Sequence, residues 1–292
     1  MSVATVASEI ERLADATGGI VGVAATQLAT GRHIGYREDE LFPTASVIKL
    51  PLLVTLHEDA IAGRIDLSER VVYRGETKVA GSGVLQYLDD GLAPTLRDLS
   101  VLMMSVSDNT ATDLLFDRVG KHRIDETMDR LGLPSIRAPF DMREMLMELV
   151  DMDHSMPGGY DELRTRLRLS AGSGGRSMIP DQADRATPAD MCRLLERIES
   201  RTILDPGACT AIIELMKRIQ SGTRIPGLLP KGTVVAHKTG SYRRLRNDVG
   251  IVYAPNGPYV IALFARELAR DNVDDDGALA RISLAVYEAL AV

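Results

Sequence analysis

Residues 42–53 read FPTASVIKLPLL, and a serine and a lysine stand three apart where the apolar run begins. Residues i and i+3 share one face of an α-helix, so a helix that opens here points Ser46 and Lys49 into the same space. A serine and a lysine placed in this way suit the roles of nucleophile and base. The stretch therefore predicts both the start of a helix and the centre of a catalytic site.

A serine hydroxyl needs a base to remove its proton, and a lysine can be that base only when it is neutral. Burial or a neighbouring cation lowers the pKa of a lysine. The candidate cation is Lys238, in HKTGS at the end of a predicted strand. A third candidate element is SDN, residues 107–109, which lies between two predicted helices.

Strand patterns occur near both ends of the chain, and helical patterns fill the middle. Residues 3–16 have helical apolar spacing and end at a glycine pair, and residues 20–36 read as a hairpin. Helical signals dominate residues 44–200. Runs of β-branched and aromatic residues return at 232–240, 248–255 and 259–266, and residues 276–292 read as a closing helix.

We expect an α/β (α+β) fold with one antiparallel sheet built from both ends of the chain, flanked by the N- and C-terminal helices, and a helical lobe inserted. The predicted α/β lobe comprises residues 1–42 and 205–292, and the helical lobe residues 43–204. Within the helical lobe, a Gly- and Ser-rich excursion at about 150–185 reads as an extended loop.

Composition narrows the class of protein. The chain has 292 residues, 45% of them hydrophobic, and a net charge of −7, with no basic run. These values fit a soluble globular protein and argue against nucleic acid or an anionic membrane as a partner. The two cysteines lie in predicted helices and are expected to be free, buried thiols. No export signal and no membrane-spanning run is visible, so we expect a cytoplasmic protein, or a periplasmic or secreted one if a leader was removed.

Three motifs stand in a fixed order: Ser46-Val-Ile-Lys49, Ser107-Asp108-Asn109 and Lys238-Thr239-Gly240. Each motif alone is a weak signal, but their order and predicted contexts agree. By this set the chain resembles the penicillin-recognising serine hydrolases, most closely the class A β-lactamases. The resemblance extends from about Gly22 to Val292, apart from the excursion at 150–185.

The resemblance implies a role for each residue of the first two motifs. Ser46 would attack the substrate carbonyl and form an acyl-enzyme, with Lys49 as its proton acceptor. Ser107 would relay a proton to the leaving nitrogen. Asn109 would hold Lys49 or the substrate amide by hydrogen bonds. Without the other motifs, SDN would be read as a helix cap.

The resemblance also implies a substrate-binding role for the KTGS residues. Lys238 would supply positive charge, and Thr239 and Ser241 would offer hydroxyls to a substrate carboxylate. Gly240 would let the strand backbone approach the substrate closely. The backbone N–H groups of Ser46 and Ser241 would form the oxyanion hole.

Two further residues are weaker candidates. Glu144 lies 37 residues after Ser107 (144 − 107), near the offset at which the family carries its water-activating glutamate. Glu148 stands where the family has an asparagine, however, and the surrounding FDMREMLMELV reads as a regular amphipathic helix, so Glu144 could equally be a surface charge. Arg246, in YRRLRND, is the expected clamp for a substrate carboxylate, with a solvated turn as the alternative.

The function that these residues predict is that of a serine hydrolase of the class A β-lactamase type. It would hydrolyse a β-lactam amide through an acyl-Ser46 intermediate, with no metal and no cofactor. Two alternatives stay open: a cytoplasmic esterase, amidase or peptidase of the same fold, and a non-turnover penicillin-binding or sensor protein. The expected partner is a small-molecule substrate, and the expected state is a monomer.

Overall fold

The computed structural model describes residues 3–154, 159–169, 174–269 and 273–291. The chain divides into two compact units, of which the first comprises residues 1–47 and 186–292 and the second residues 48–185. Each unit has its own core, and each is described by itself.

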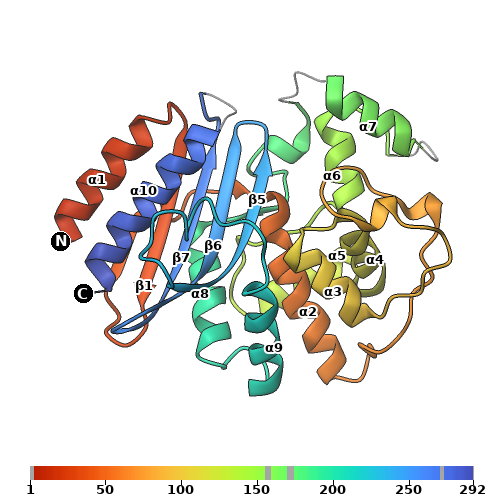
Figure 1. Cartoon of the computed structure of the whole chain (residues 1–292), viewed down its shortest axis with the longest axis horizontal. Coiled ribbons are helices and arrows are strands. Elements are labelled where there is room, and N and C mark those ends of the chain that lie inside the picture. Colours follow the sequence, from red (N-terminus) through yellow and green to blue (C-terminus); the bar gives the residue numbers. More distant parts are fainter. Residues whose placement is uncertain (1–2, 155–158, 170–173, 270–272, 292) are drawn as a thin grey trace. The chain divides into compact units, whose positions relative to one another are not determined.

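The first unit is built on a five-stranded antiparallel sheet with the strand order β2-β1-β7-β6-β5 (Figure 1). Its strands are β1 (Ile20–Gln27), β2 (His33–Tyr36), β5 (Val234–Tyr242), β6 (Leu245–Ala254) and β7 (Gly257–Arg266), and its helices are α1 (Val3–Asp15), α8 (Pro188–Glu199), α9 (Pro206–Met216) and α10 (Val273–Leu290). Two short strands, β3 (Phe42–Pro43) and β4 (Arg185–Ala186), pair separately.

Helices cover both faces of this sheet, and the side-chain alternation along β1 shows how. Val21 and Val23 belong to the core cluster that α1 and α10 complete, whereas a Cβ on Gly22 would meet Phe42 and Pro188, the first residue of α8. α9 packs against β5. Because both faces are covered, the central strands read as nearly continuous apolar runs rather than as strict alternations.

The second unit is helical. Its α-helices are α2 (Lys49–Ile61), α3 (Leu96–Ser105), α4 (Asn109–Val119), α5 (Lys121–Arg130), α6 (Met142–Leu149) and α7 (Tyr160–Leu169), with 3₁₀ turns η2 (Gly75–Thr77), η3 (Leu85–Tyr87) and η4 (Arg176–Met178). A further 3₁₀ turn, η1 (Ala45–Ile48), connects the first unit to α2. α4 packs against α2, α3, α5 and α6, so it is the central helix of this unit.

The predicted fold class is confirmed, because an antiparallel sheet lies between the terminal helices and α8, and a helical unit is inserted. The predicted boundary at residue 204 needs correction. The inserted unit ends at Arg185, and α8 belongs with the sheet, since it buries its apolar face against β1, β6 and β7. Helical periodicity in a sequence shows that a helix has an apolar face, but not which partner covers it.

The excursion at 150–185 is only partly a loop. It contains α7 and η4, while residues 155–158 and 170–173 lie outside the described part of the chain. Cys192 and Cys209 are buried free thiols. Within the described ranges, no helix has the length and apolar character needed to cross a membrane.

Candidate active site

In the first unit, β5 lies directly against the turn that carries Ser46. A Cβ built on Gly240 would lie 2.4 Å from the Thr44 carbonyl oxygen, 3.1 Å from the Val47 nitrogen and 3.2 Å from the Ser46 nitrogen. No other residue has so little volume at this position, so a glycine is what permits the close approach. The KTGS strand and the backbone N–H of Ser46 are thereby neighbours.

Asn247, on β6, fixes the beginning of that turn. Its Nδ2 donates to the carbonyl oxygens of Pro43 (2.8 Å) and Thr44 (3.0 Å), and its Oδ1 accepts from the N–H of Ala265 (3.2 Å). Asn247 is fully buried, and its amide is satisfied on both sides. The turn is therefore tied to the centre of the sheet.

Lys238 is fully buried, and this burial lowers the pKa of its ammonium group to about 7. The Asp248 carboxylate opposes the shift, and the Arg224 guanidinium adds to it. Asp248 is held in place because it accepts from the Ile225 N–H at 3.0 Å and lies 2.8 Å from Nδ1 of His237. The middle of β5 thus holds a cation that is easily deprotonated.

Arg224 is a residue that the motifs do not reveal. It is 5% exposed, and its guanidinium donates to Ser241 Oγ (2.6 Å), to the carbonyl oxygens of Gly240 (3.1 Å) and Asn247 (2.7 Å), and to Asp276 Oδ1 (2.7 Å). It lies in a loop 14 residues before Lys238 (238 − 224), and no local sequence signal points to it. The permanent positive charge beside the KTGS hydroxyls comes from this side chain.

The predicted clamp, Arg246, has a different position. Its Nη1 donates to the backbone carbonyls of Tyr242 and Leu245, and its Nε lies 3.5 Å from Asp276 Oδ1. These contacts tie the guanidinium to the turn between β5 and β6. The guanidinium that donates to Ser241 Oγ is that of Arg224.

In the second unit, Lys49 joins two of the predicted site residues. Its side chain is fully buried, and Nζ donates to the Ser107 carbonyl oxygen (2.8 Å), to Ser107 Oγ (3.1 Å) and to Asn109 Oδ1 (2.8 Å). Ser46 precedes it by three residues, in the 3₁₀ turn η1 that runs into α2. Residues three apart in a 3₁₀ turn lie on the same side of the backbone.

The middle residue of SDN has a structural role. Asp108 is the N-cap of α4: its Oδ1 accepts from the Ala111 N–H at 2.9 Å, while Oδ2 accepts from the N–H groups of Val84 and Leu85, each at 2.7 Å. Capping and catalysis are therefore not alternatives here. Asp108 fixes the helix start, and the residues on either side of it contact Lys49.

Glu144 is the third residue of α6 and completes a capping box with Asp141, each side chain accepting from the other's backbone N–H. Its carboxylate also pairs with Lys121. The α6 side chain beside the site is Leu146, because a Cβ on Gly81 would lie 3.9 Å from Leu146 Cδ1 and 2.9 Å from Asn109 Nδ2.

The helical repeat separates Glu144 from that position. A step of two residues turns an α-helix by about 200°, so Glu144 lies on the side of α6 opposite Leu146. The interpretation of Glu144 as a water-activating base is therefore not supported by its contacts. The alternative stated from the sequence, a charge on the outer face of a regular helix, describes its position better, with the addition of its part in the cap.

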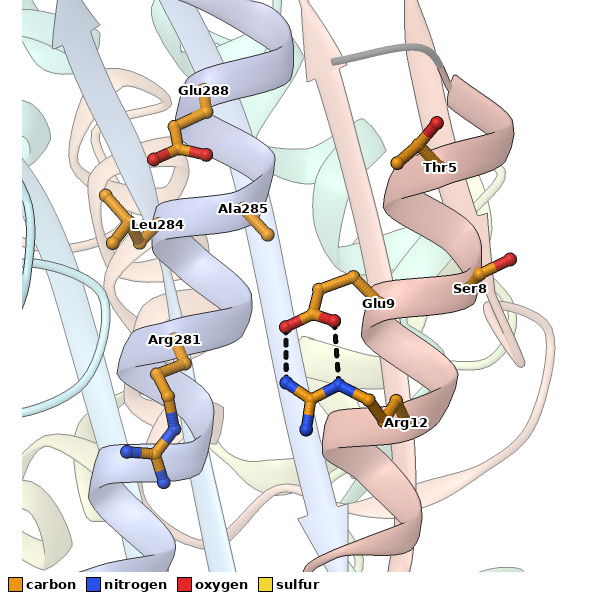
Figure 2. Close-up of a pocket in the computed structure, with 8 residues that line it drawn as sticks. All are labelled: Thr5, Ser8, Glu9, Arg12, Arg281, Leu284, Ala285 and Glu288. Carbon is orange, nitrogen blue, oxygen red and sulfur yellow. Dashed lines mark hydrogen bonds and ion pairs between the residues drawn. The ribbon is translucent and has the colours of Figure 1, made fainter.

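A hollow of about 620 Å³ lies between α1 and α10 (Figure 2). The ion pair between Glu9 and Arg12 lies along its α1 side, and Arg281 and Glu288 lie along its α10 side. None of its lining residues comes from the three motifs, so it is not the candidate site. Among the residues that the structure describes, no three His, Cys, Asp or Glu side chains are grouped to hold a metal ion.

Comparisons with known proteins show which proteins this chain resembles. Beta-lactamase SME-1 of Serratia marcescens is 24% identical over 297 residues, which cover 97% of this chain and 88% of that protein. The beta-lactamase regulatory protein BlaB of Streptomyces cacaoi is 27% identical, with 82% of each chain covered. The crystal structure of a β-lactamase from Sphaerobacter thermophilus superposes with a TM-score of 0.80 at 29% identity, covering 98% of this chain and 97% of that one.

The model of one protein family, described as the beta-lactamase enzyme family, matches residues 5–290. That match takes in both units and all three motifs. Since it spans nearly the whole sequence, this chain belongs to the beta-lactamase enzyme family, as its motifs predicted.

Proposed function

We propose that this enzyme is a serine hydrolase of the class A type that opens the amide of a β-lactam by acylation of Ser46. The observation that carries the proposal is the buried Lys49 side chain, whose Nζ contacts both Ser107 and Asn109 and in its neutral form can accept a proton. A buried lysine in contact with a second hydroxyl can take up a proton and pass it on. The family membership of the chain supports the same reaction.

In the acylation step, Ser46 Oγ would form a bond to the lactam carbonyl carbon while its proton passes to Lys49. The negative charge on the carbonyl oxygen would be bound by the backbone N–H groups of Ser46 and Ser241. The carbon–nitrogen bond then breaks, and the leaving nitrogen takes a proton from Ser107 Oγ, which Lys49 resupplies. All protons are accounted for without a metal.

Recognition of the substrate's carboxylate would rest on Lys238 and Arg224. Arg224 supplies a guanidinium that orients Ser241 Oγ, whereas Lys238 is charged only in part near neutral pH. Thr239 would add a hydroxyl donor. We further propose a monomer that acts on a small molecule, because every group in this scheme comes from one chain.

A β-lactamase and a penicillin-binding protein differ in the step that releases the acyl group. Hydrolysis needs a base for water, and the carboxylate predicted for that task is turned toward Lys121. We propose that water is activated without Glu144 and that deacylation is the slow step. The apolar Leu146 beside Asn109 favours, as a second candidate, a penicillin-binding protein that stays acylated, and BlaB shows that relatives named as regulatory proteins exist.

The test is the mass of the intact protein after mixing with excess penicillin G, sampled from seconds to an hour while released product is quantified. The proposal expects an adduct on the wild type, none on Ser46→Ala, and product well above one equivalent. A persistent adduct with no released product would establish the penicillin-binding alternative, because the opened lactam stays attached to Ser46 until the ester is hydrolysed. An equal adduct on Ser46→Ala would overturn the assignment of the nucleophile.

A further inference from the structure

Helix α7 lies within the Gly- and Ser-rich excursion at 150–185, and it is anchored to the second unit. Leu163 is 3% exposed, and Tyr160, at the helix start, donates its hydroxyl to Gln86 Oε1 at 2.8 Å. Figure 1 shows α7 next to α6. The contact with Gln86 links this additional helix to a loop that precedes α3.

Gln86 is a buried amide whose hydrogen bonds all go to protein atoms. It is 4% exposed, and its Nε2 donates to the carbonyl oxygens of Gly81 (2.7 Å) and Gly83 (3.1 Å) while Oε1 accepts from Tyr160. A buried amide is held in one orientation when both of its ends are bonded. The Tyr160 hydroxyl therefore orients the Gln86 amide, and this amide in turn holds the carbonyl groups of Gly81 and Gly83.

The loop that Gln86 holds lies against SDN with no space between them. A Cβ on Gly83 would be 2.3 Å from the Asp108 carboxyl carbon, and one on Gly81 would be 2.9 Å from Asn109 Nδ2. Both glycines have a positive φ, 95° at Gly81 and 106° at Gly83, which a residue with a side chain rarely adopts. The Asn109 N–H donates to the carbonyl oxygen between them, that of Ser82, at 3.1 Å.

The side chain of Asn109 is oriented by the same loop. Nδ2 donates one hydrogen to the Ala80 carbonyl oxygen at 2.9 Å, and Oδ1 accepts from Lys49 at 2.8 Å. An amide nitrogen carries two hydrogens, so the direction of the second is set by these two bonds. The resemblance implies that Asn109 binds the substrate amide, and this second hydrogen would be the donor to its carbonyl group.

We propose that Tyr160 is a positioning residue. Through Gln86 and the loop 80–85, it sets the direction of Asn109 Nδ2. It thereby favours β-lactams that carry an acylamino side chain. The inference rests on the proposed function. Removing the Tyr160 hydroxyl leaves Gln86 Oε1 buried without its donor, and the amide and the loop it holds gain freedom. The loss should appear only for substrates that use the second Asn109 hydrogen.

The experiment compares Tyr160→Phe with the wild type on two substrates. Penicillin G has a side-chain carbonyl, and 6-aminopenicillanic acid has the same bicyclic core with a bare amine. We expect the second-order rate constant of acylation by penicillin G to fall about tenfold, and that of 6-aminopenicillanic acid to change less than about twofold. Tyr253→Phe is the matched control, because it removes a hydroxyl that donates to Glu199 at 2.9 Å in the first unit.

A double-variant cycle tests the route through Gln86. If Tyr160 acts through that amide, Tyr160→Phe should have no further effect in a Gln86→Met background. Equal losses on both substrates, or no loss on either, would overturn the inference. So would the same tenfold, substrate-selective loss in Tyr253→Phe.

Failure of the inference is distinguishable from failure of the proposed function. If the wild type forms no adduct with either substrate, the proposed function is wrong. If the wild type is acylated by both and Tyr160→Phe behaves like Tyr253→Phe, only the role of Tyr160 is wrong.

Discussion

An unusual backbone conformation occurs directly before Ser46 and at Ser107. Ala45, directly before Ser46, has a φ of 47°, and Ser107 has a φ of 55°. Such a conformation costs a residue with a side chain roughly 1–3 kcal/mol and persists only where neighbours hold it. Asn247 holds the turn before Ser46, and Lys49 holds the Ser107 carbonyl. The hydroxyls that must transfer protons are therefore fixed before any substrate arrives.

The buried Lys238 predicts a pH dependence of substrate binding. Only its protonated form attracts a carboxylate, and its pKa of about 7 means that this form becomes scarce above neutral pH. We expect kcat/KM for acylation by penicillin G, divided by kcat/KM for an activated ester without a carboxylate, to fall about tenfold between pH 6 and pH 8. The ratio cancels the titration of groups that act on both substrates.

The same measurement on Lys238→Met supplies the control. In that variant the ratio should be low already at pH 6 and should not change with pH. A ratio that stays constant in the wild type from pH 6 to pH 8 would mean that Lys238 keeps its proton or does not bind the carboxylate. In the second case, Arg224 would be the cation that recognises the carboxylate.

The three motifs could be predicted because each is a short run of adjacent residues, whereas Arg224 and Asn247 could not. Arg224 reaches Ser241 across a loop, and Asn247 reaches the Thr44 carbonyl across the sheet. Both contacts depend on strand order and register, which the sequence of either residue alone does not show. Arg246 lies closer to KTGS in the sequence, so the sequence favoured it over Arg224 as the clamp for a substrate carboxylate.

Among the helices, α6 shows why a sequence offset is a weak guide to a side chain's direction. Its capping box fixes Glu144 as the third residue, and the helical repeat then turns Leu146 toward Asn109. The amphipathic pattern of this helix was visible in the sequence. Which of its residues lies beside the site depends on where α6 starts, and Asp141 decides that.

Replacing Glu144 by glutamine tests the role of α6. We expect the deacylation rate to stay unchanged and the free energy of unfolding to fall by about 1 kcal/mol, because a charged cap and the contact with Lys121 are lost. Asp98→Asn is the matched control, since Asp98 completes the capping box of α3 with Thr95. If Glu144→Gln traps the acyl-enzyme while Asp98→Asn does not, Glu144 is the water-activating base after all.

For the chain as a whole, the division of the sequence into terminal strands and central helices predicted the two units well. The error at α8 has a physical reason, because an amphipathic helix can cover a sheet or another helix with the same pattern. The sequence shows a short basic, helix-like piece at α7, but the Gly- and Ser-rich segments that flank it favoured the interpretation of the whole segment as a loop. Its one buried leucine and its tyrosine contact, rather than its own periodicity, tie it to the second unit.

The stability of the whole protein should rise with pH above neutrality, and Lys238 should be the cause. The unfolded chain keeps this lysine protonated up to about pH 10.4, while the folded chain releases the proton near pH 7. The unfolded state therefore binds more protons in this window, so the free energy of unfolding increases with pH. From pH 7 to pH 8.5 the increase should be roughly 1.5 kcal/mol.

The upper limit of that window is set by Cys192, whose burial raises the pKa of its thiol. Above about pH 8.5 the unfolded thiol loses its proton first, which lowers stability and offsets the contribution of the lysine. Urea unfolding at several pH values below this limit measures the effect. Lys238→Met should abolish the rise, and the exposed Lys231→Met should retain it; a rise of the same size in Lys238→Met would show that another group is responsible.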